Sequence, residues 1–298
     1  MSTKVISPDS VDLSVQAAAP SAFAQLRRSL KSVPVLIALV LLCGIVLLAL
    51  FAPFLATTDP KAIDPGHRLK VAGVEFWLGS DSFGRDVYSR VLYGARTSLI
   101  VGLGAALISV SIGLVFGVIA GYFRTADAII MRIMDGVMAI PGILLAIALV
   151  SLSGASLFTV LVAITIPEIP RVVRLVRSVI LTVRNEPYVE AAISLGTPVP
   201  VILVRHLVPN TVAPLVVQGT YIFASAILTE AILSFLGAGL GSEVSSWGNI
   251  MAEGRMYFQM RPGLILYPGI FLSLTVLSVN LLGDAMRDAL DPRMARKL

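Results

Sequence analysis

The sequence alternates between long apolar runs and shorter segments that hold most of the charged residues. Five of the runs contain no Asp, Glu, Lys or Arg over 22 to 32 residues. A helix that crosses the roughly 30 Å hydrocarbon core of a bilayer needs about 20 apolar residues, because each residue advances it by about 1.5 Å. Each run is therefore long enough to cross a membrane. These runs are residues 32–58, 97–123, 136–167, 206–229 and 262–283.

The longest run, residues 136–167, has room for two helices. Its middle, residues 151–156, consists mainly of Ser, Gly and Ala, a composition that favours a turn. The division gives one helix at about 133–152 and another at about 157–178, and two prolines in the second predict a kink near Glu168. The pattern as a whole predicts an all-α polytopic membrane protein with six transmembrane helices.

The composition supports this interpretation. Of the 298 residues, 56% are hydrophobic and 14% are charged, and the mean hydropathy is +0.89. A soluble domain normally has about 25% charged residues, and a chain of this length could bury a core with less apolar sequence. The composition therefore excludes a disordered chain and, in practice, a water-soluble enzyme. Cys43 is the only cysteine, so the chain cannot form an internal disulfide.

The basic residues indicate how the helices are oriented. In the six-helix topology, 15 Lys and Arg residues fall on one side of the membrane and 8 fall on the other. Basic residues are retained on the cytoplasmic side, so we expect both termini to be cytoplasmic. When the acidic residues are counted too, the whole net charge of +5 lies on that side. No surplus of positive charge is left that would require a nucleic-acid partner.

Three arginines, Arg171, Arg174 and Arg177, follow one another at intervals of three at the cytoplasmic end of the fourth predicted helix. Long basic side chains at such positions reach the membrane interface, so we expect them to contact anionic membrane lipid. Docking of a partner protein is the alternative.

The cytoplasmic segment after this helix carries the signals of a short helix. Asn185 can cap it, Pro187 suits its first turn, Glu190 favours its positive end and Gly196 suits a left-handed stop. A second short helix is expected toward Pro209. The first helix could dock another protein or lie on the membrane surface. Its candidate contact face consists of Tyr188, Ala191, Ala192 and Leu195.

The same segment resembles a motif of bacterial ABC importer permeases. Glu190-Ala191-Ala192, Gly196 and His206-Leu207-Val208-Pro209 are similar to the EAA motif, E-A-A-x(3)-G-x(9)-I-x-L-P, with His206 in place of isoleucine and Val208 in place of leucine. The resemblance implies that residues 185–210, the EAA loop, insert into a groove on an ATP-hydrolysing subunit. The coupling residues that it implies are Tyr188, Glu190, Ala191, Ala192, Leu195, Gly196 and Pro209.

A second resemblance concerns residues 78–99. They resemble the external segment of the C-type subunit in dipeptide, oligopeptide and nickel permeases. Similar segments follow in the expected order over residues 25–293, although residues 239–244 replace the usual Gln- and Pro-rich turn. These segments are Ile140-Pro141-Gly142-Ile143-Leu144-Leu145, Ser234-Phe235-Leu236-Gly237, Trp247-Gly248-Asn249-Ile250-Met251 and Asn280-Leu281-Leu282-Gly283-Asp284.

This family resemblance implies a type I ABC importer permease fold in a bacterial inner membrane. Residues 1–95 would form the N-terminal tail, the first transmembrane helix and a periplasmic segment, 96–290 the permease domain and 291–298 a cytoplasmic tail. The implied partners are a homologous B-type permease, two P-loop ATPase subunits that bind ATP and Mg²⁺, and a periplasmic substrate-binding protein. The expected cargo is di- and oligopeptides, with nickel chelates, glutathione or opines as alternatives.

The chain itself lacks the residues of an enzyme. No G-x(4)-G-K-[ST] phosphate loop occurs, no nucleophile–base group can be assembled, and the two histidines are too isolated for a metal site. We therefore expect no catalytic residue, metal or cofactor in this subunit. The alternatives are a proton-coupled secondary transporter, which would need several buried ionisable residues, and a structural membrane subunit, which would not explain the EAA loop.

Two further features are candidates for function. Glu230 is a carboxylate within an apolar helix; it could line the translocation path, or it could lie near the outer helix end beside water or an arginine. Gly113, Gly117 and Gly121 form a stripe of small residues that allows close helix packing, either within the chain or with the partner permease.

Overall fold

The computed structural model describes residues 32–290, in which helices predominate and no strand is formed. The predicted tails at residues 1–31 and 291–298 lie outside the described part. The helices are α2 (Val33–Leu50), α3 (Ala52–Leu55), α4 (Val87–Tyr122), α5 (Arg124–Met138), α6 (Gly142–Ser153), α7 (Leu157–Val183), α8 (Pro187–Ser194), α9 (Val199–Val201), α10 (Val212–Phe235), α11 (Trp247–Gly254) and α12 (Gly263–Leu290). Ile202–Leu207 winds as a π-helix, and Pro65–His67, Val208–Thr211 and Arg255–Tyr257 are short 3₁₀ helices.

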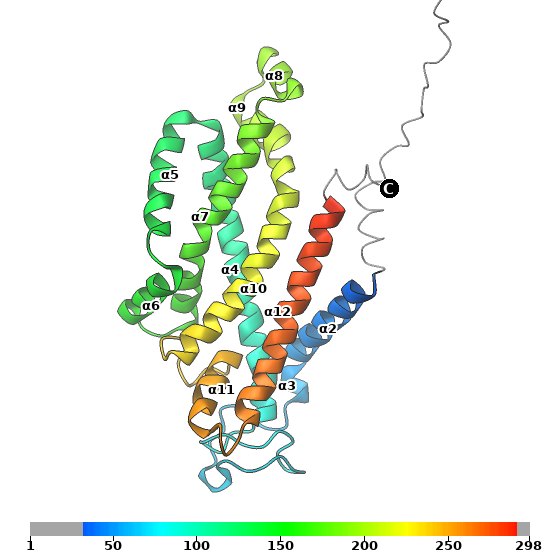
Figure 1. Cartoon of the computed structure of the whole chain (residues 1–298), viewed down its shortest axis with the longest axis vertical. Coiled ribbons are helices and arrows are strands. Elements are labelled where there is room, and N and C mark those ends of the chain that lie inside the picture. The colour runs from blue at the N-terminus through cyan, green and yellow to red at the C-terminus, as the bar shows by residue number, and fades with distance from the viewer. Residues whose placement is uncertain (1–31, 291–298) are drawn as a thin grey trace, which may run out of the picture.

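The long helices form an elongated bundle around α4, α7 and α10 (Figure 1). α4 packs most extensively against α7, α10 packs against α4 and α12, and α2 packs against α12 and α4. α5 and α6 lie on the other side of the bundle, beside α7. One end of the bundle carries α8 and α9, and we call it the α8 end. The opposite end carries α11 and the segment between α3 and α4, and we call it the α11 end.

Four helical segments of the described chain are long and apolar enough to cross a membrane: α2, α4, α12 and Val199–Phe235, which contains α10. The bent pair of α5 and α6 adds a fifth if the two form one span. α7 has 27 residues, but one acidic residue and three arginines make it more polar than the other long helices. The structure thus confirms a helical, multi-span chain, while the number of six spans stays a prediction.

The helix predicted at 133–152 is wrong, because the structure breaks it. α5 ends at Met138 and α6 begins at Gly142, and the two helices are bent by 85°. The break contains Pro141, whose ring disfavours a helical conformation in the preceding residue and which has no N–H to donate. The break therefore has a local cause that the apolar pattern conceals.

The turn predicted at residues 151–156 is confirmed. α6 ends at Ser153, and Gly154 adopts a φ of 84°, a conformation that is unfavourable for other residues. Ser156 then caps α7, since its hydroxyl accepts a hydrogen bond from the Thr159 N–H at 3.1 Å. α7 continues as one helix through Pro167 and Pro170.

α4 begins ten residues earlier than the apolar run predicts, at Val87 rather than 97. Asp86 caps its start by accepting a hydrogen bond from the Ser89 N–H at 2.9 Å. The same carboxylate accepts a hydrogen bond from the Thr57 hydroxyl at 2.7 Å, which ties the segment after α3 to the beginning of α4. The extra turns belong to the charged segment that the sequence assigned outside the membrane.

The glycine stripe on α4 packs within the chain. A Cβ atom on Gly117 would lie 2.5 Å from Cβ of Val176, and one on Gly121 would lie 2.6 Å from Cβ of Ile180. Gly113 meets Val172 of α7 in the same way. The most extensively packed helix pair in the bundle, α4 with α7, therefore depends on the absence of side chains at these three positions.

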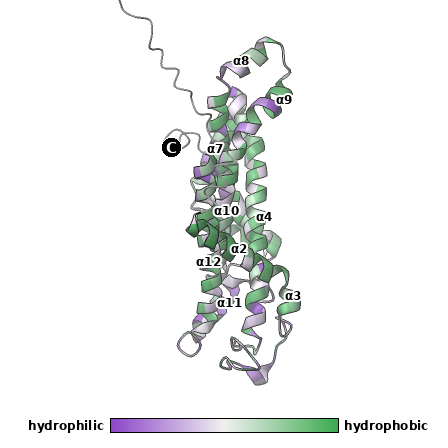
Figure 2. Cartoon of the chain, turned by 90° about the vertical axis from the view of Figure 1, so that its right-hand side faces the viewer, coloured by the Kyte–Doolittle hydropathy of each residue, from purple (hydrophilic) through white to green (hydrophobic). Residues whose placement is uncertain are grey.

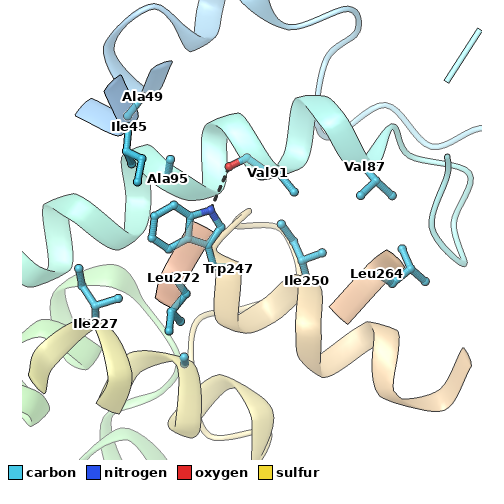
Figure 3. Close-up of a cluster of buried hydrophobic side chains, with 11 residues drawn as sticks. Ile45, Ala49, Val87, Val91, Ala95, Ile227, Trp247, Ile250, Leu264 and Leu272 are labelled. Atoms are coloured by element: carbon cyan, nitrogen blue, oxygen red, sulfur yellow. Dashed lines mark hydrogen bonds between the residues drawn. The ribbon is translucent and has the colours of Figure 1, made fainter. Parts of the chain in front are cut away.

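The core at the α11 end surrounds Trp247, which is fully buried (Figure 3). Its indole Nε1 donates a hydrogen bond to the Val91 carbonyl of α4 at 3.1 Å. Ile45 of α2, Ile227 of α10 and Leu272 of α12 belong to the same cluster. The short helix α11 is thereby fixed to α2, α4, α10 and α12, the four segments that are each long and apolar enough to cross a membrane.

The outer surface of α2 is apolar along the length of the helix (Figure 2). Its exposed residues include Val33, Val40, Leu47 and Leu50, each more than half exposed. A soluble chain would not leave such a helix in water, whereas hydrocarbon chains solvate it without a penalty. This face is therefore suited to the hydrocarbon core of a membrane.

Candidate functional site

The predicted short helix of the EAA loop is present as α8. Pro187 stands at its first position and Glu190 lies in its first turn. Gly196 follows with a φ of 76°, and its N–H donates a hydrogen bond to the Ile193 carbonyl at 2.9 Å. The predicted cap is wrong, because Asn185 turns back to donate a hydrogen bond to the Leu181 carbonyl of α7. The helix is thus started by its proline and ended by its glycine.

The inner side of the EAA loop is anchored on the bundle. Val189 of α8 and Ile202 and Leu207 of the π-helix are buried in one apolar cluster. The same cluster contains Ile180 of α7 and Leu215 of α10. The second predicted short helix is therefore a composite of a π-helix and a 3₁₀ turn, which brings two apolar residues onto the bundle.

The contact face predicted for α8 needs one correction. Ala192 is only 8% exposed and lies on the inner side with Val189. Tyr188, Ala191 and Leu195 are exposed as expected, and Leu195 is 85% exposed. α8 has only eight residues, so the turns on both sides of it determine which residues face the bundle. The spacing of residues within the helix does not determine this alone.

The outer side of the EAA loop offers an acidic and apolar surface. Glu190 and Pro209 are exposed, and so are Tyr188, Ile193 and Leu195. The Tyr188 hydroxyl accepts a hydrogen bond from Nδ2 of Asn210 at 3.3 Å, which links α8 to the 3₁₀ helix that precedes α10. This surface can therefore contact a partner and remain rigidly joined to α7 and α10.

The three arginines of α7 have acidic partners within the chain. Arg174 contacts Asp135 of α5 at 2.6 Å, and Arg177 contacts Asp127 of α5 at 2.5 Å. Arg171 contacts Glu168 on its own helix at 3.1 Å. Two of the arginines therefore hold α5 against α7, a role that the sequence did not reveal because the partners are 39 and 50 residues away.

Glu230 lies inside the chain, only 1% exposed. Its Oε1 accepts hydrogen bonds from the hydroxyls of Ser234 and Ser246, both at 2.8 Å, while Oε2 has no partner within residues 32–290. Ser246 also caps α11 by accepting from the Asn249 N–H. Two serines thus bind one oxygen of this carboxylate, and the bond from Ser246 ties α10 to α11. That Glu230 lines a translocation path stays a prediction.

A buried ion-pair group at the α11 end was missed by the sequence analysis. Arg90 is fully buried and contacts both Asp81 and Glu253, the latter at 2.7 Å. Arg85 contacts the same two acids, at 2.6 Å and 2.5 Å. Two arginines and two carboxylates cancel in charge, which allows burial of the first turn of α4. Glu253 is too distant in sequence for spacing to suggest it.

A second missed residue is Glu168, which is 8% exposed within α7. Its signal was present, because an acid between two prolines at the end of a long uncharged stretch is a functional candidate by default. Its carboxylate accepts a hydrogen bond from the Ser225 hydroxyl of α10 at 3.2 Å and faces a small cavity beside α6.

Within residues 32–290 no group of His, Cys, Asp or Glu could hold a metal ion. His67 contacts Asp64 at 2.5 Å, and this hydrogen bond lowers the pKa of the Asp64 carboxyl below its ordinary value. The ring of His206 lies 6.2 Å from that of Tyr188. Both histidines thus have a local role in the structure.

Comparison with known proteins identifies the family. The profile of the family described as binding-protein-dependent transport system inner membrane component matches residues 113–296, more than half of the chain. The chain belongs to this family. The N-terminal transmembrane domain of oligopeptide transport permease C matches residues 24–71. As a member of the family, the chain is a multi-pass inner membrane permease of an ABC transporter and not an enzyme, as the sequence predicted.

Individual relatives of this permease match most of its length. It is 53% identical over 251 residues to a probable peptide ABC transporter permease protein of Sinorhizobium fredii, covering 84% of this chain and 86% of the relative. It is 40% identical to the dipeptide transport system permease protein of Alkalihalophilus pseudofirmus, covering 92% and 89%. It is 44% identical to the glutathione transport system permease protein of Pectobacterium atrosepticum, covering 73% of each chain.

Proposed function

We propose that the chain is the C-type transmembrane subunit of an ATP-driven importer of di- and oligopeptides. In this proposal the spans are α2, α4, the α5–α6 pair, α7, α10 and α12, and both termini are cytoplasmic. The α8 end is the cytoplasmic end, because the beginning of α5 and the segment between α7 and α10, which belong to the predicted basic segments, lie there. The α11 end then faces the periplasm.

The EAA loop is the element that couples this subunit to an ATPase. The observation that carries the proposal is its two-sided construction, with Glu190 and Leu195 exposed at the tip of the bundle and Val189 buried against α7 and α10. A partner that moves the outer side therefore displaces two long spans as well. Tyr188, Ala191, Gly196 and Pro209 complete the outer surface and its turns, while Ala192 belongs to the anchor.

The remaining partners follow from this arrangement. Two ATPase subunits bind ATP and Mg²⁺ at the cytoplasmic end, and a homologous B-type permease completes the path. A periplasmic binding protein delivers the substrate to residues 56–86 and 237–262 at the α11 end. Closure of the ATPases pushes on the EAA loops, and the helices rock to open the path outward.

The peptide cargo is supported by the relatives, two of which are named for peptide or dipeptide transport. Another relative is named for glutathione transport. Both kinds of cargo are small molecules with free amino and carboxylate groups. The proposal therefore names short peptides with free ends as the substrate class.

Reconstitution of the complex into liposomes tests the coupling role. We expect uptake of a labelled dipeptide to require ATP and the ATPase subunits, and Glu190→Lys to abolish it while membrane insertion is unchanged. The reversed charge would repel a partner surface that accepts an acid. Asp288→Lys, at an exposed acid near the end of α12 and outside both the EAA loop and the proposed binding-protein surface, is the matched control and should leave uptake unchanged. Uptake that persists without the ATPase subunits, driven for example by a proton gradient, would contradict the proposal.

A further inference from the structure

A polar cavity of about 190 Å³ lies where α6 begins, between α7 and α10. Its polar lining comes from Glu168 and Arg171 of α7 and from Ser225 and Thr229 of α10, and the first residue of α6, Gly142, closes one side. Glu168 is residue 12 of the 27 in α7, and Ser225 is residue 14 of the 24 in α10. The cavity therefore lies near the middle of both helices, where polar residues are costly to bury in a membrane.

The charged groups of this cavity are only partly used by the chain. Nη1 of Arg171 donates to both carboxylate oxygens of Glu168, each at 3.1 Å, and the Ser225 hydroxyl donates to Oε1 at 3.2 Å. The Nε and Nη2 groups of Arg171 donate to no residue of the described chain, and its side chain is 58% exposed. The buried carboxylate of Glu168 thus lies beside the guanidinium of Arg171, which has donors left for a ligand, at the opening of the cavity.

The break between α5 and α6 directs a helix N-terminus at the same cavity. The first N–H groups of any α-helix have no carbonyl partner within the helix, and this end carries a partial positive charge. α6 has 12 residues, and Gly142 allows its first turn to approach α7, since a Cβ there would lie 3.1 Å from Cβ of Pro167. In membrane transporters, such discontinuous helices point their N-termini at the anionic groups of substrates.

We propose that this cavity is a transient binding site for the charged end groups of a zwitterionic peptide as it crosses the subunit. Glu168 receives the ammonium group, and Arg171 with the N-terminus of α6 receives the carboxylate. The inference rests on the proposed function, because it assumes that peptides pass this face of the bundle. In the empty site, Glu168 and Arg171 pair with each other and their charges cancel. When a zwitterion binds, its ammonium group pairs with Glu168 and its carboxylate pairs with Arg171. Neither state therefore leaves an unpaired charge in the membrane.

The site can be tested by protection of an introduced thiol. In the complete transporter complex, reconstituted in nanodiscs without binding protein, Cys43→Ser removes the only natural thiol of this chain and Thr229→Cys places one in the cavity wall. Modification is read from the mass of this chain alone. We expect dialanine to slow modification by a small methanethiosulfonate reagent. N-acetyl-dialanine amide, which has the same backbone without charged ends, should give no protection.

Variants of the charged residues assign the protection to this site. Arg171→Gln should raise the dialanine concentration for half-protection about tenfold, which is the scale of one charge-assisted hydrogen bond. Glu168→Gln should have a similar effect. Arg96→Gln, at an exposed arginine of α4 that does not line the cavity, is the matched control and should change nothing. Because Arg171 is largely exposed, its variant keeps the test valid even if Glu168→Gln fails to assemble.

Equal protection by the blocked peptide, no protection by dialanine, or an unchanged half-protection concentration in Arg171→Gln would each overturn the inference. ATP-dependent dipeptide uptake is measured on the same unmodified complex with binding protein added. Uptake with no protection would overturn this site and leave the proposed function intact. Protection without any ATP-dependent uptake would overturn the proposed function instead, and the site would stand as a peptide-binding cavity.

Discussion

At the scale of single residues, the absence of a side chain matters as much as any contact. Because Gly117 and Gly121 have no side chain, α4 approaches α7 more closely than it could with any other residue at these positions. Trp247 does the opposite at the α11 end, where one large residue fills the space between α2, α4, α10 and α12. Small residues thus close the bundle toward the α8 end, and a large residue closes it at the other.

The glycine stripe gives a prediction at this scale. Gly117→Ala places a methyl group 2.5 Å from Cβ of Val176, so the two helices must separate or strain. We expect destabilisation of about 1–3 kcal/mol, the usual range for overpacking. The chain is purified in detergent, heated to a series of temperatures and run on size-exclusion chromatography. The measured quantity is the temperature at which half of the monodisperse peak is lost, the heating midpoint.

Gly136→Ala is the matched control for this prediction. Gly136 also lies in a helix, but a Cβ there would meet nothing within 4 Å. This variant should match the natural chain or exceed its midpoint slightly, since alanine favours the helix more than glycine does. Equal midpoints for Gly117→Ala and Gly136→Ala would show that the stripe is not tightly packed.

At the scale of elements, α5 is held in a different way from its neighbours. None of its residues is buried, and its contacts are with the end of α4 and with α7. The pairs of Asp127 with Arg177 and of Asp135 with Arg174 cross from α5 to α7. Charge pairs, rather than an apolar interface, therefore fix this helix within the chain.

Charge reversal tests this attachment. Asp127→Arg should lower the same heating midpoint, because the new arginine would lie beside Arg177 and the two positive charges would repel each other. Arg177→Asp should lower it as well, because it places two negative charges side by side. The double variant restores an opposite pair and should recover most of the loss. The coupling between the two changes is expected to be up to about 1 kcal/mol, as for other partly exposed pairs. Additive losses in the double variant would mean that the pair contributes nothing.

Local signals in the sequence predicted local structure well. The turn at residues 151–156, the proline that starts α8 and Gly196 at its end each depend on the conformational preference of one or two residues. The inward position of Ala192 was not predictable in this way, because the packing of the whole EAA loop sets it. The break before Gly142 was hidden because residues on both sides of Pro141 are apolar.

Long-range pairs were beyond the sequence for a different reason. Arg90 and Glu253 are 163 residues apart, and each looks like an ordinary charge in an external loop. Only the fold brings them together, and their neutralisation in turn lets α4 start ten residues before the apolar run. The boundary of a helix in a membrane protein thus depends on partners that a single sequence does not mark.

At the scale of the whole molecule, the two ends of the bundle have different surfaces. The α8 end exposes Glu190 and Leu195 on a short projecting helix, and the α11 end exposes Val74, Met256 and Met260 on longer loops. These ends are the surfaces on which soluble partners can act, because the sides of the bundle carry apolar residues such as those of α2.

The orientation of the bundle in the membrane can be measured by thiol labelling. In a Cys43→Ser chain, Val74→Cys at the α11 end should react with a membrane-impermeant maleimide in intact spheroplasts. Thr125→Cys, in the first turn of α5, should react only after permeabilisation. Both positions are exposed, so reactivity reports the side of the membrane. The reverse pattern would place the termini in the periplasm.

The ion pairs between α5 and α7 have a consequence for how the chain is made. An unpaired arginine or aspartate in a membrane helix raises the free energy of insertion, by about 2.5–3.5 kcal/mol at the centre of the helix and by less toward its ends, where Asp127 and Arg177 lie. α5 is synthesised first, with Asp127 and Asp135, and α7 follows with Arg174 and Arg177. Insertion of the two helices as one neutral pair avoids this penalty. α5 is therefore expected to wait at the insertion machinery until α7 emerges from the ribosome.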